Sequence, residues 1–184
     1  MLSPDARYAA LLNFGYGTQK SQAHQSIAIL DLKTNQIADF PDDRLAESSK
    51  QTYFIGLAFS GDGKHLYASI SSITDPTGTE KNDVGNGIAV YGFADGKVIP
   101  ERFVKIGLQP LAAGRKVAAG LRNDASATAI PYPAGLAVVS QQGKEKLLVA
   151  NNLSDNVILI DAESGEVLQS FDLSTHAIVP TSFP

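Results

Sequence analysis

Apolar residues occur along this chain in short runs, and small or polar turn-forming residues separate the runs. Such runs, rich in Val, Ile, Leu and Tyr, predict β-strands. No window of useful length keeps apolar residues at the i, i+3, i+4, i+7 spacing of a helix. The one candidate, 110–121, is interrupted by Gly114 and Gly120, and we expect a loop there with at most one helical turn. The sequence therefore predicts an all-β fold.

The strand pattern repeats three times, with four predicted strands, a to d, in each unit. Gly56-Leu57-Ala58 in the second unit matches Gly135-Leu136-Ala137 in the third, and Asp-Gly or Ser-Gly pairs predict hairpins between later strands. Four antiparallel strands in a repeat of about 40 residues indicate a β-propeller. The predicted blade units are 2–45, 53–107 and 132–173. An ordinary β-sandwich with chance similarity between its hairpins is the alternative.

Three units are too few for a closed ring, which takes roughly four to eight blades. The first unit begins inside its a strand, and the tail 174–184 resembles the approach to a further blade. We therefore expect a partial propeller. It would be completed by remaining blades, by another part of an assembly, or by association of copies.

The longest predicted connections, 13–25, 71–86 and 108–133, join strand b to c or strand d to the next a. In a propeller these connections emerge on one face, and loops on a rigid scaffold commonly carry binding sites. The sequence thus predicts one elaborated face that binds a ligand or partner. Its candidate contact residues are Tyr16, His24, Asp75, Glu80, Asp83, Arg115 and Arg122.

Recognisable catalytic chemistry is weak in this sequence. Asp75, Glu80 and Asp83 offer oxygen ligands for a divalent metal such as Ca²⁺, but without EF-hand spacing, so solvated charge is the simpler interpretation. The same holds for Arg115 and Arg122, which would suit a phosphate or carboxylate. No phosphate loop, dinucleotide fingerprint, nucleophile elbow or metal-spaced His pair is present. We predict no cofactor and assign no catalytic residue.

Two further sets of residues are expected to be structural. Asp42 and Asp43 follow Pro41 in a polar stretch, which predicts a solvated turn. Tyr8, Tyr67 and Tyr91 stand at strand positions and are expected to pack between blades rather than bind a ligand.

Composition narrows the function further. With 184 residues and 19.4 kDa, the chain is one domain or part of one, and 43% hydrophobic residues suit a packed core. A net charge of −4 with no basic stripe argues against nucleic-acid binding. Cys is absent, which excludes disulfides and thiolate metal sites. No apolar run is long enough for a membrane-spanning helix, and the first residues do not resemble a signal peptide.

The third unit resembles the YVTN repeat of bacterial YncE-like β-propellers. The resemblance rests on 148–168, with Asn151-Asn152, Asp155-Asn156 and Asp161, and on the turn 59–64, which is similar to the Ser-Pro-Asp-Gly turn of that superfamily. It implies a periplasmic or secreted bacterial protein. It also implies that the Asn and Asp residues shape the b–c turn, and that Asp161 caps the c–d hairpin. Some similar propellers are joined to an alkaline-phosphatase-like phosphoesterase domain.

Our preferred interpretation is a non-catalytic β-propeller scaffold whose loops 13–25, 71–86 and 108–133 bind a protein domain or a small polar ligand. The alternative is the propeller portion of a metal-dependent hydrolase of phosphoesterase or lactonase type. A quinone-dependent dehydrogenase is less favoured, because Trp, which usually stacks on that cofactor, is absent.

Overall fold

The computed structural model describes residues 1–14, 25–45, 49–81, 83–111, 128–141 and 144–173. In these ranges the chain is all-β, as predicted, and apart from the short 3₁₀ turn Asp43–Leu45 they contain no helix. No helix in the described ranges has the length and apolar character that a membrane crossing needs. The strands form four antiparallel sheets, three of them large.

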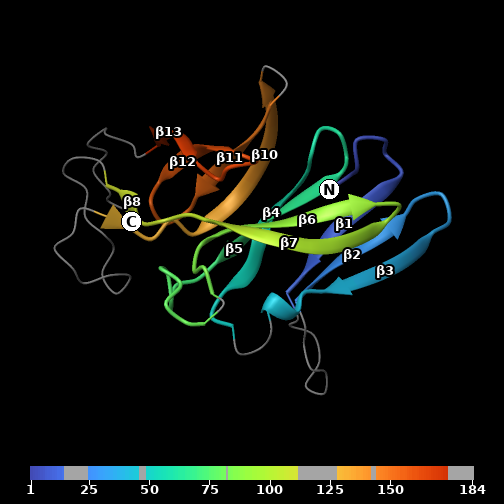
Figure 1. Ribbon diagram of the computed structural model, residues 1–184, viewed down its shortest axis with the longest axis horizontal. Helices are drawn as coiled ribbons and strands as arrows, with labels where there is room; N and C mark the ends of the chain where they lie inside the picture. The colour runs from blue at the N-terminus through green and yellow to red at the C-terminus, as the bar shows by residue number, and fades with distance from the viewer. Residues whose placement is uncertain (15–24, 46–48, 82, 112–127, 142–143, 174–184) are drawn as a thin grey trace, which may run out of the picture.

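Each large sheet is a meander in which strands adjacent in sequence pair with one another (Figure 1). The first sheet contains β1 (Tyr8–Asn13), β2 (Ser26–Asp31) and β3 (Gln36–Pro41). The second contains β4 (Thr52–Phe59), β5 (His65–Ser71), β6 (Gly87–Ala94) and β7 (Lys97–Lys105). The third contains β10 (Pro133–Gln141), β11 (Lys144–Asn151), β12 (Asn156–Asp161) and β13 (Val167–Asp172).

The connection 108–133 differs from the loop that the sequence predicts. Its ends pair as a two-stranded ribbon formed by β8 (Gln109–Pro110) and β9 (Thr128–Ala129). Most of 110–121, where at most one helical turn is expected, lies outside the described residues. Pairing of the two ends satisfies backbone groups that a plain loop would leave to solvent.

The turns between strands repeat the same side-chain chemistry, which supports the alignment of the units. Before β1, Ser3 Oγ accepts a hydrogen bond from the backbone N–H of Tyr8 at 2.9 Å. Before β5, Ser60 Oγ accepts one from the backbone N–H of His65 at 2.8 Å. Short polar side chains that bond nearby backbone groups favour such tight turns.

The hairpins that follow β2 and β12 also share one hydrogen-bonding pattern, in which an Asp carboxylate accepts from backbone N–H groups of the turn. Asp31 Oδ1 accepts a hydrogen bond from the backbone N–H of Lys33 at 2.8 Å. Asp161 Oδ1 accepts one from Glu163 N–H at 3.0 Å, and Ser164 N–H also donates to it at 2.8 Å. Asp161 thus caps its hairpin, as the resemblance implies.

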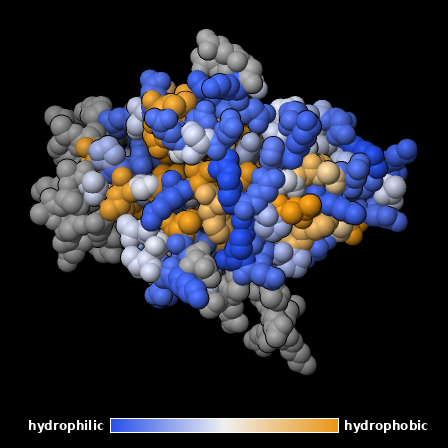
Figure 2. All heavy atoms as spheres, in the orientation of Figure 1, coloured by the Kyte–Doolittle hydropathy of each residue, from blue (hydrophilic) through white to orange (hydrophobic). Residues whose placement is uncertain are grey.

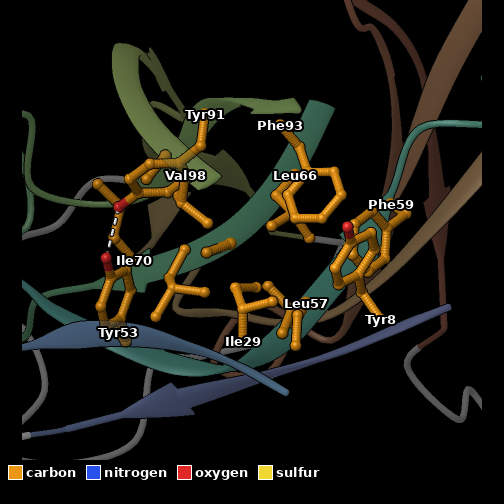
Figure 3. Close-up of a cluster of buried hydrophobic side chains, with 14 of the residues drawn as sticks. Tyr8, Ile29, Tyr53, Leu57, Phe59, Leu66, Ile70, Tyr91, Phe93 and Val98 are labelled. Carbon is orange, nitrogen blue, oxygen red and sulfur yellow. Dashed lines mark hydrogen bonds between the residues drawn. The ribbon is translucent and has the colours of Figure 1, made fainter. Parts of the chain in front are cut away.

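The three large sheets are stacked, with the second sheet between the first and the third (Figure 1). Side chains of the first and second sheets form one apolar cluster, which includes Tyr8, Ile29, Leu57 and Phe93 (Figure 3). Side chains of the second and third sheets form another. We call these the first and second clusters.

Both faces of the second sheet are buried, and this explains its composition. Along β5, Leu66, Ala68 and Ile70 belong to the first cluster, whereas Tyr67 belongs to the second. A strand covered on both faces needs apolar residues at successive positions rather than at alternate ones. Tyr67, like Tyr8 and Tyr91, is buried, which confirms the packing role predicted for these tyrosines.

The second and third sheets approach each other most closely at Gly56. A Cβ atom added there would overlap the carbonyl oxygen of Ala134 and lie 2.9 Å from Leu136 Cγ. At Gly135, the equivalent position of the third sheet, the only heavy atom within 4 Å of such a Cβ would be Ala150 Cβ, at 3.5 Å. The two glycines match in sequence but differ in surroundings, because the described residues place no further sheet beyond the third.

We therefore expect Gly56→Ala to lower the free energy of unfolding by about 2 kcal/mol, the usual scale of overpacking in a close contact. Gly135→Ala is the matched control and should change it by less than about 0.5 kcal/mol. Urea denaturation followed by far-UV circular dichroism measures both values. Equal effects of the two substitutions would contradict the close approach of β4 and β10.

Candidate functional site

The end of the sheets that carries the long connections is held together by hydrogen bonds of amide side chains. Gln25, which follows the segment 15–24, accepts hydrogen bonds through Oε1 from Tyr53 N–H at 2.7 Å and from Thr52 Oγ1 at 2.8 Å. Its Nε2 donates to the carbonyl oxygens of Leu45 and Gln51, each at 3.2 Å. The first sheet is thereby joined to the start of β4.

The same end continues through Gln51 and Ser71. Gln51 Oε1 accepts hydrogen bonds from the backbone N–H groups of Val84 at 2.8 Å and Gly85 at 3.2 Å. Ser71 Oγ donates to the carbonyl oxygen of Pro133 at 2.9 Å. The described ends of all three long connections therefore meet at one end of the stack.

Only part of the predicted contact set lies in the described ranges. Tyr16, His24, Arg115 and Arg122 lie outside the described residues. Asp75, Glu80 and Asp83 lie in 71–86, and the structure gives each of them its own partners.

Asp75 organises its own loop. Its carboxylate accepts hydrogen bonds from Thr79 N–H at 2.8 Å, from Thr79 Oγ1 at 2.9 Å and from Glu80 N–H at 3.0 Å. Desolvation acts to raise the pKa of Asp75, but the hydrogen bonds from Glu80 and Thr79 outweigh it, so the pKa lies below its ordinary value. Asp75 is a loop-capping carboxylate.

The other two acids of the loop have different partners. Asp83 accepts hydrogen bonds from Ser49 Oγ at 2.9 Å and from Lys50 N–H at 2.8 Å. Glu80 Oε1 lies 3.7 Å from Lys50 Nζ. Across the described ranges no group of three or more His, Cys, Asp or Glu residues is placed to hold a metal ion. These acids therefore brace the loop against the segment before β4.

A buried ionic network, which the sequence does not predict, lies under the same end. The expected solvated turn is wrong for Asp42, whose side chain is 1% exposed, although Asp43 is exposed. Arg44 donates to the Asp42 carboxylate through Nη2 at 2.7 Å and Nε at 2.9 Å, and Tyr91 OH donates at 2.6 Å. Tyr53 OH lies 2.5 Å from Tyr91 OH (Figure 3).

The electrostatics of this network favour a structural role. Burial acts to raise the pKa of Asp42, but the hydrogen bonds from Arg44 and Tyr91 outweigh it and keep the pKa below its ordinary value. Burial is also the main reason that the pKa values of Tyr53 and Tyr91 are raised, so both phenols stay protonated. An ionised carboxylate with its partners in place and two neutral phenols hold the Asp43–Leu45 turn between the first and second sheets.

A polar cleft of about 450 Å³ lies between the second and third sheets, at the opposite end, where the short turns are. Tyr67 OH donates to Glu145 Oε2 at 3.2 Å, and Arg102 Nη2 donates to the carbonyl oxygen of Ala162 at 2.6 Å. Burial, followed by the charge of Glu145, raises the pKa of Tyr67. The sequence predicts no site at this end. The cleft is also lined by Asp62, His65, Val90, Glu101, Lys144, Asp161 and Glu163.

A second hollow, of about 370 Å³, lies between β1 and β4 and is apolar. Leu11, Leu12 and Phe14 line one side, and Phe54 and Ile55 line the other. Leu2 makes an isolated antiparallel bridge with Ala9 beside it. The hollow offers packing surface and no catalytic side chain.

Comparisons with known proteins leave the family open. No protein-family model matches the chain, and no curated protein matches it. Hydrazine synthase of Kuenenia stuttgartiensis is a similar solved structure, with 14% sequence identity and a TM-score of 0.49. The similarity covers 87% of this chain and 38% of that chain, so this chain spans well under half of it.

We expect Asp42→Asn to lower the free energy of unfolding at pH 7 by about 3 kcal/mol, because it leaves the charge of half-buried Arg44 unpaired. Asp43→Asn, at the exposed neighbour, is the matched control and should change it by less than about 0.5 kcal/mol. The folded-state pKa of Asp42 is lowered, so its contribution is complete above the unfolded pKa of about 4.

That contribution should disappear as the pH falls through the folded-state pKa. Urea denaturation of the wild type and of Asp42→Asn from pH 7 downward should therefore show their stabilities converging in acid. A difference that stays constant across this range would contradict the ionised, buried carboxylate.

Asp75→Ala should accelerate amide hydrogen exchange at Thr79 and Glu80 by about tenfold or more, because each loses an acceptor that is charged. Glu80→Gln, which keeps those acceptors, is the control and should leave the rates unchanged. Mass spectrometry of exchanged peptides covering 71–86 measures the effect. Slower exchange in the wild-type loop on addition of Ca²⁺ would contradict the capping role and favour a metal site.

Proposed function

We propose that this chain is part of a β-propeller that serves as a non-catalytic binding module. Its partner surface is the end of the stack that carries 13–25, 71–86 and 108–133. The propeller is supported by three meandering sheets that stack in sequence order through equivalent faces. Sheets arranged side by side in this way are the units of that architecture.

The observation that carries the binding role is the set of side-chain hydrogen bonds at the loop-bearing end. Gln25, Gln51 and Ser71 join the ends of the three long connections to one another through main-chain groups. Binding residues lie disproportionately on loops whose ends are positioned by a rigid scaffold. The short turns at the other end have no comparable length.

The chemistry of the described part of this surface favours binding over hydrolysis. The carboxylates of Asp42 and Asp75 are committed to internal hydrogen bonds and have lowered pKa values, whereas a general acid needs a raised one. Ile73, in the connection 71–86, is 48% exposed. An exposed apolar side chain among polar neighbours suits contact with a protein domain. The resemblance to YncE-like repeats supports a periplasmic or secreted location.

A photoreactive residue in place of Ile73 should cross-link to a protein partner in the producing cells. Ile99 is the matched control, because it is also an isoleucine, is 61% exposed and lies on β7 away from the long connections. Mass spectrometry would identify adducts that depend on position 73. Equal labelling from both positions would contradict a partner surface at the loop-bearing end. Metal-dependent phosphoesterase or lactonase turnover by the purified chain would favour the hydrolase alternative.

A further inference from the structure

The strand register defines which face of each sheet looks toward the next sheet. In the second sheet Tyr67 pairs with Val90, and in the third sheet Leu148 pairs with Leu159. The positions of the second sheet that pack on the third hold Tyr67, Ile88, Val90 and Val104. The equivalent positions of the third sheet hold Leu148, Val157, Leu159 and Phe171. We call this latter set the outward face of the third sheet.

This outward face is apolar but not covered within the described ranges. The four residues of the second sheet are buried, whereas Leu148, Val157 and Leu159 are only half-buried and Phe171 is 40% exposed. Figure 2 shows hydrophobic side chains gathered on the surface over β12 and β13. An antiparallel sheet with one face in water normally carries polar residues on it, so this face has the composition of an interface.

The third sheet is also less polar at these positions than the sheet that it follows. Leu148 stands where the second sheet has Tyr67, and Gln169, which pairs with Leu159, stands where it has Arg102. A surface that packed on this face would not have to bury a guanidinium group. The charged residues on this face are Lys146 and Asp161, and they lie opposite one another in the register, so each has a neighbour of opposite charge.

The first sheet carries the complementary face. On the face opposite the first cluster, β1 and β2 carry Ala9, Leu11, Ala28 and Leu30, β3 carries Asp39, and Leu32 follows β2. Leu11 also lines the hollow between β1 and β4. The equivalent positions of the second sheet pack on the first sheet and are buried in the first cluster. Leu11 is 54% exposed and Leu32 is also exposed. One copy of the chain therefore displays both halves of a sheet-to-sheet contact.

We propose that two copies of this chain associate head to tail, with the outward face of each third sheet packed on the outward face of the partner's first sheet. The proposal rests on the propeller-like stack of sheets in the proposed function. It does not depend on the partner surface proposed at the loop-bearing end. Two copies give six sheets, within the range of about four to eight blades that close a ring. A contact between different faces of identical chains forms a closed ring when the rotation that relates neighbouring copies returns to the first copy.

The first test is the mass of the 184-residue chain in solution. Sedimentation velocity at micromolar concentration should give twice 19.4 kDa. Phe171→Asp should raise the dissociation constant of the dimer by about tenfold or more, because it places a charge in a desolvated contact. Ile99→Asp, an exposed apolar position on β7, is the matched control and should remain dimeric. A monomeric wild type, or a Phe171→Asp protein that dimerises as well as wild type, overturns the proposal.

The second test distinguishes head-to-tail contact from packing of two third sheets. Leu11→Asp on the first sheet should also give a folded monomer, checked by far-UV circular dichroism. An equimolar mixture of the Leu11→Asp and Phe171→Asp proteins should recover a dimer through one intact contact. Failure to recover it, or a Leu11→Asp protein that stays dimeric, overturns the head-to-tail arrangement. Cross-linking at Ile73 is a separate measurement. A failure of the dimer proposal therefore does not decide whether the loop-bearing end binds a partner.

Discussion

The constraint on which the structure depends is the burial of both faces of the second sheet. Along β6, Ile88 and Val90 face the third sheet while Ala89 and Tyr91 face the first. Burying a side chain of this size stabilises the fold by about 1.5–3 kcal/mol relative to exposure, and neither neighbouring sheet can be removed without exposing a row of them. The stack is therefore the unit that folds, and the hydrogen bonds within each sheet follow from it.

Polar groups are needed where the strands end, and this need shapes the loop-bearing end. The strands emerge there into long connections, and buried backbone donors and acceptors must find partners. Gln25 is suited to this role because an amide accepts and donates at once without carrying charge, whereas Gln51 contributes its carbonyl oxygen as an acceptor. Asp42 is the charged residue buried at this end, and its carboxylate needs the positive charge of Arg44 beside it for that reason. Most of the described polar groups at the loop-bearing end therefore have hydrogen-bond partners, with Gln51 Nε2 and Asn151 Oδ1 as exceptions.

The sequence predicts the local parts of this fold well and the non-local parts poorly. Hairpins such as the one that Asp161 caps are specified by neighbouring residues. The burial of Asp42 depends on Tyr91, 49 residues later in the chain, so the sequence around Asp42 indicates only a polar turn. Arg44, two positions after it, is the one local signal of an ion pair. The cleft beside Tyr67 is missed for the same reason, because two separate sheets create it.

Within the described ranges, the outer edge strands carry features that hinder further strand pairing, whereas the outward faces are open. The edge strands β3 and β7 contain Pro41 and Pro100, and β7 and β13 each lie beside a register shift. Proline and bulges hinder the addition of another strand to an edge. In the described part of the chain, the outward face of the third sheet is mainly aliphatic, with Leu148, Val157 and Leu159 half-buried beside the charged pair Lys146 and Asp161. Sheets with protected edges and open apolar faces are suited to face-to-face packing rather than to the addition of strands at their edges.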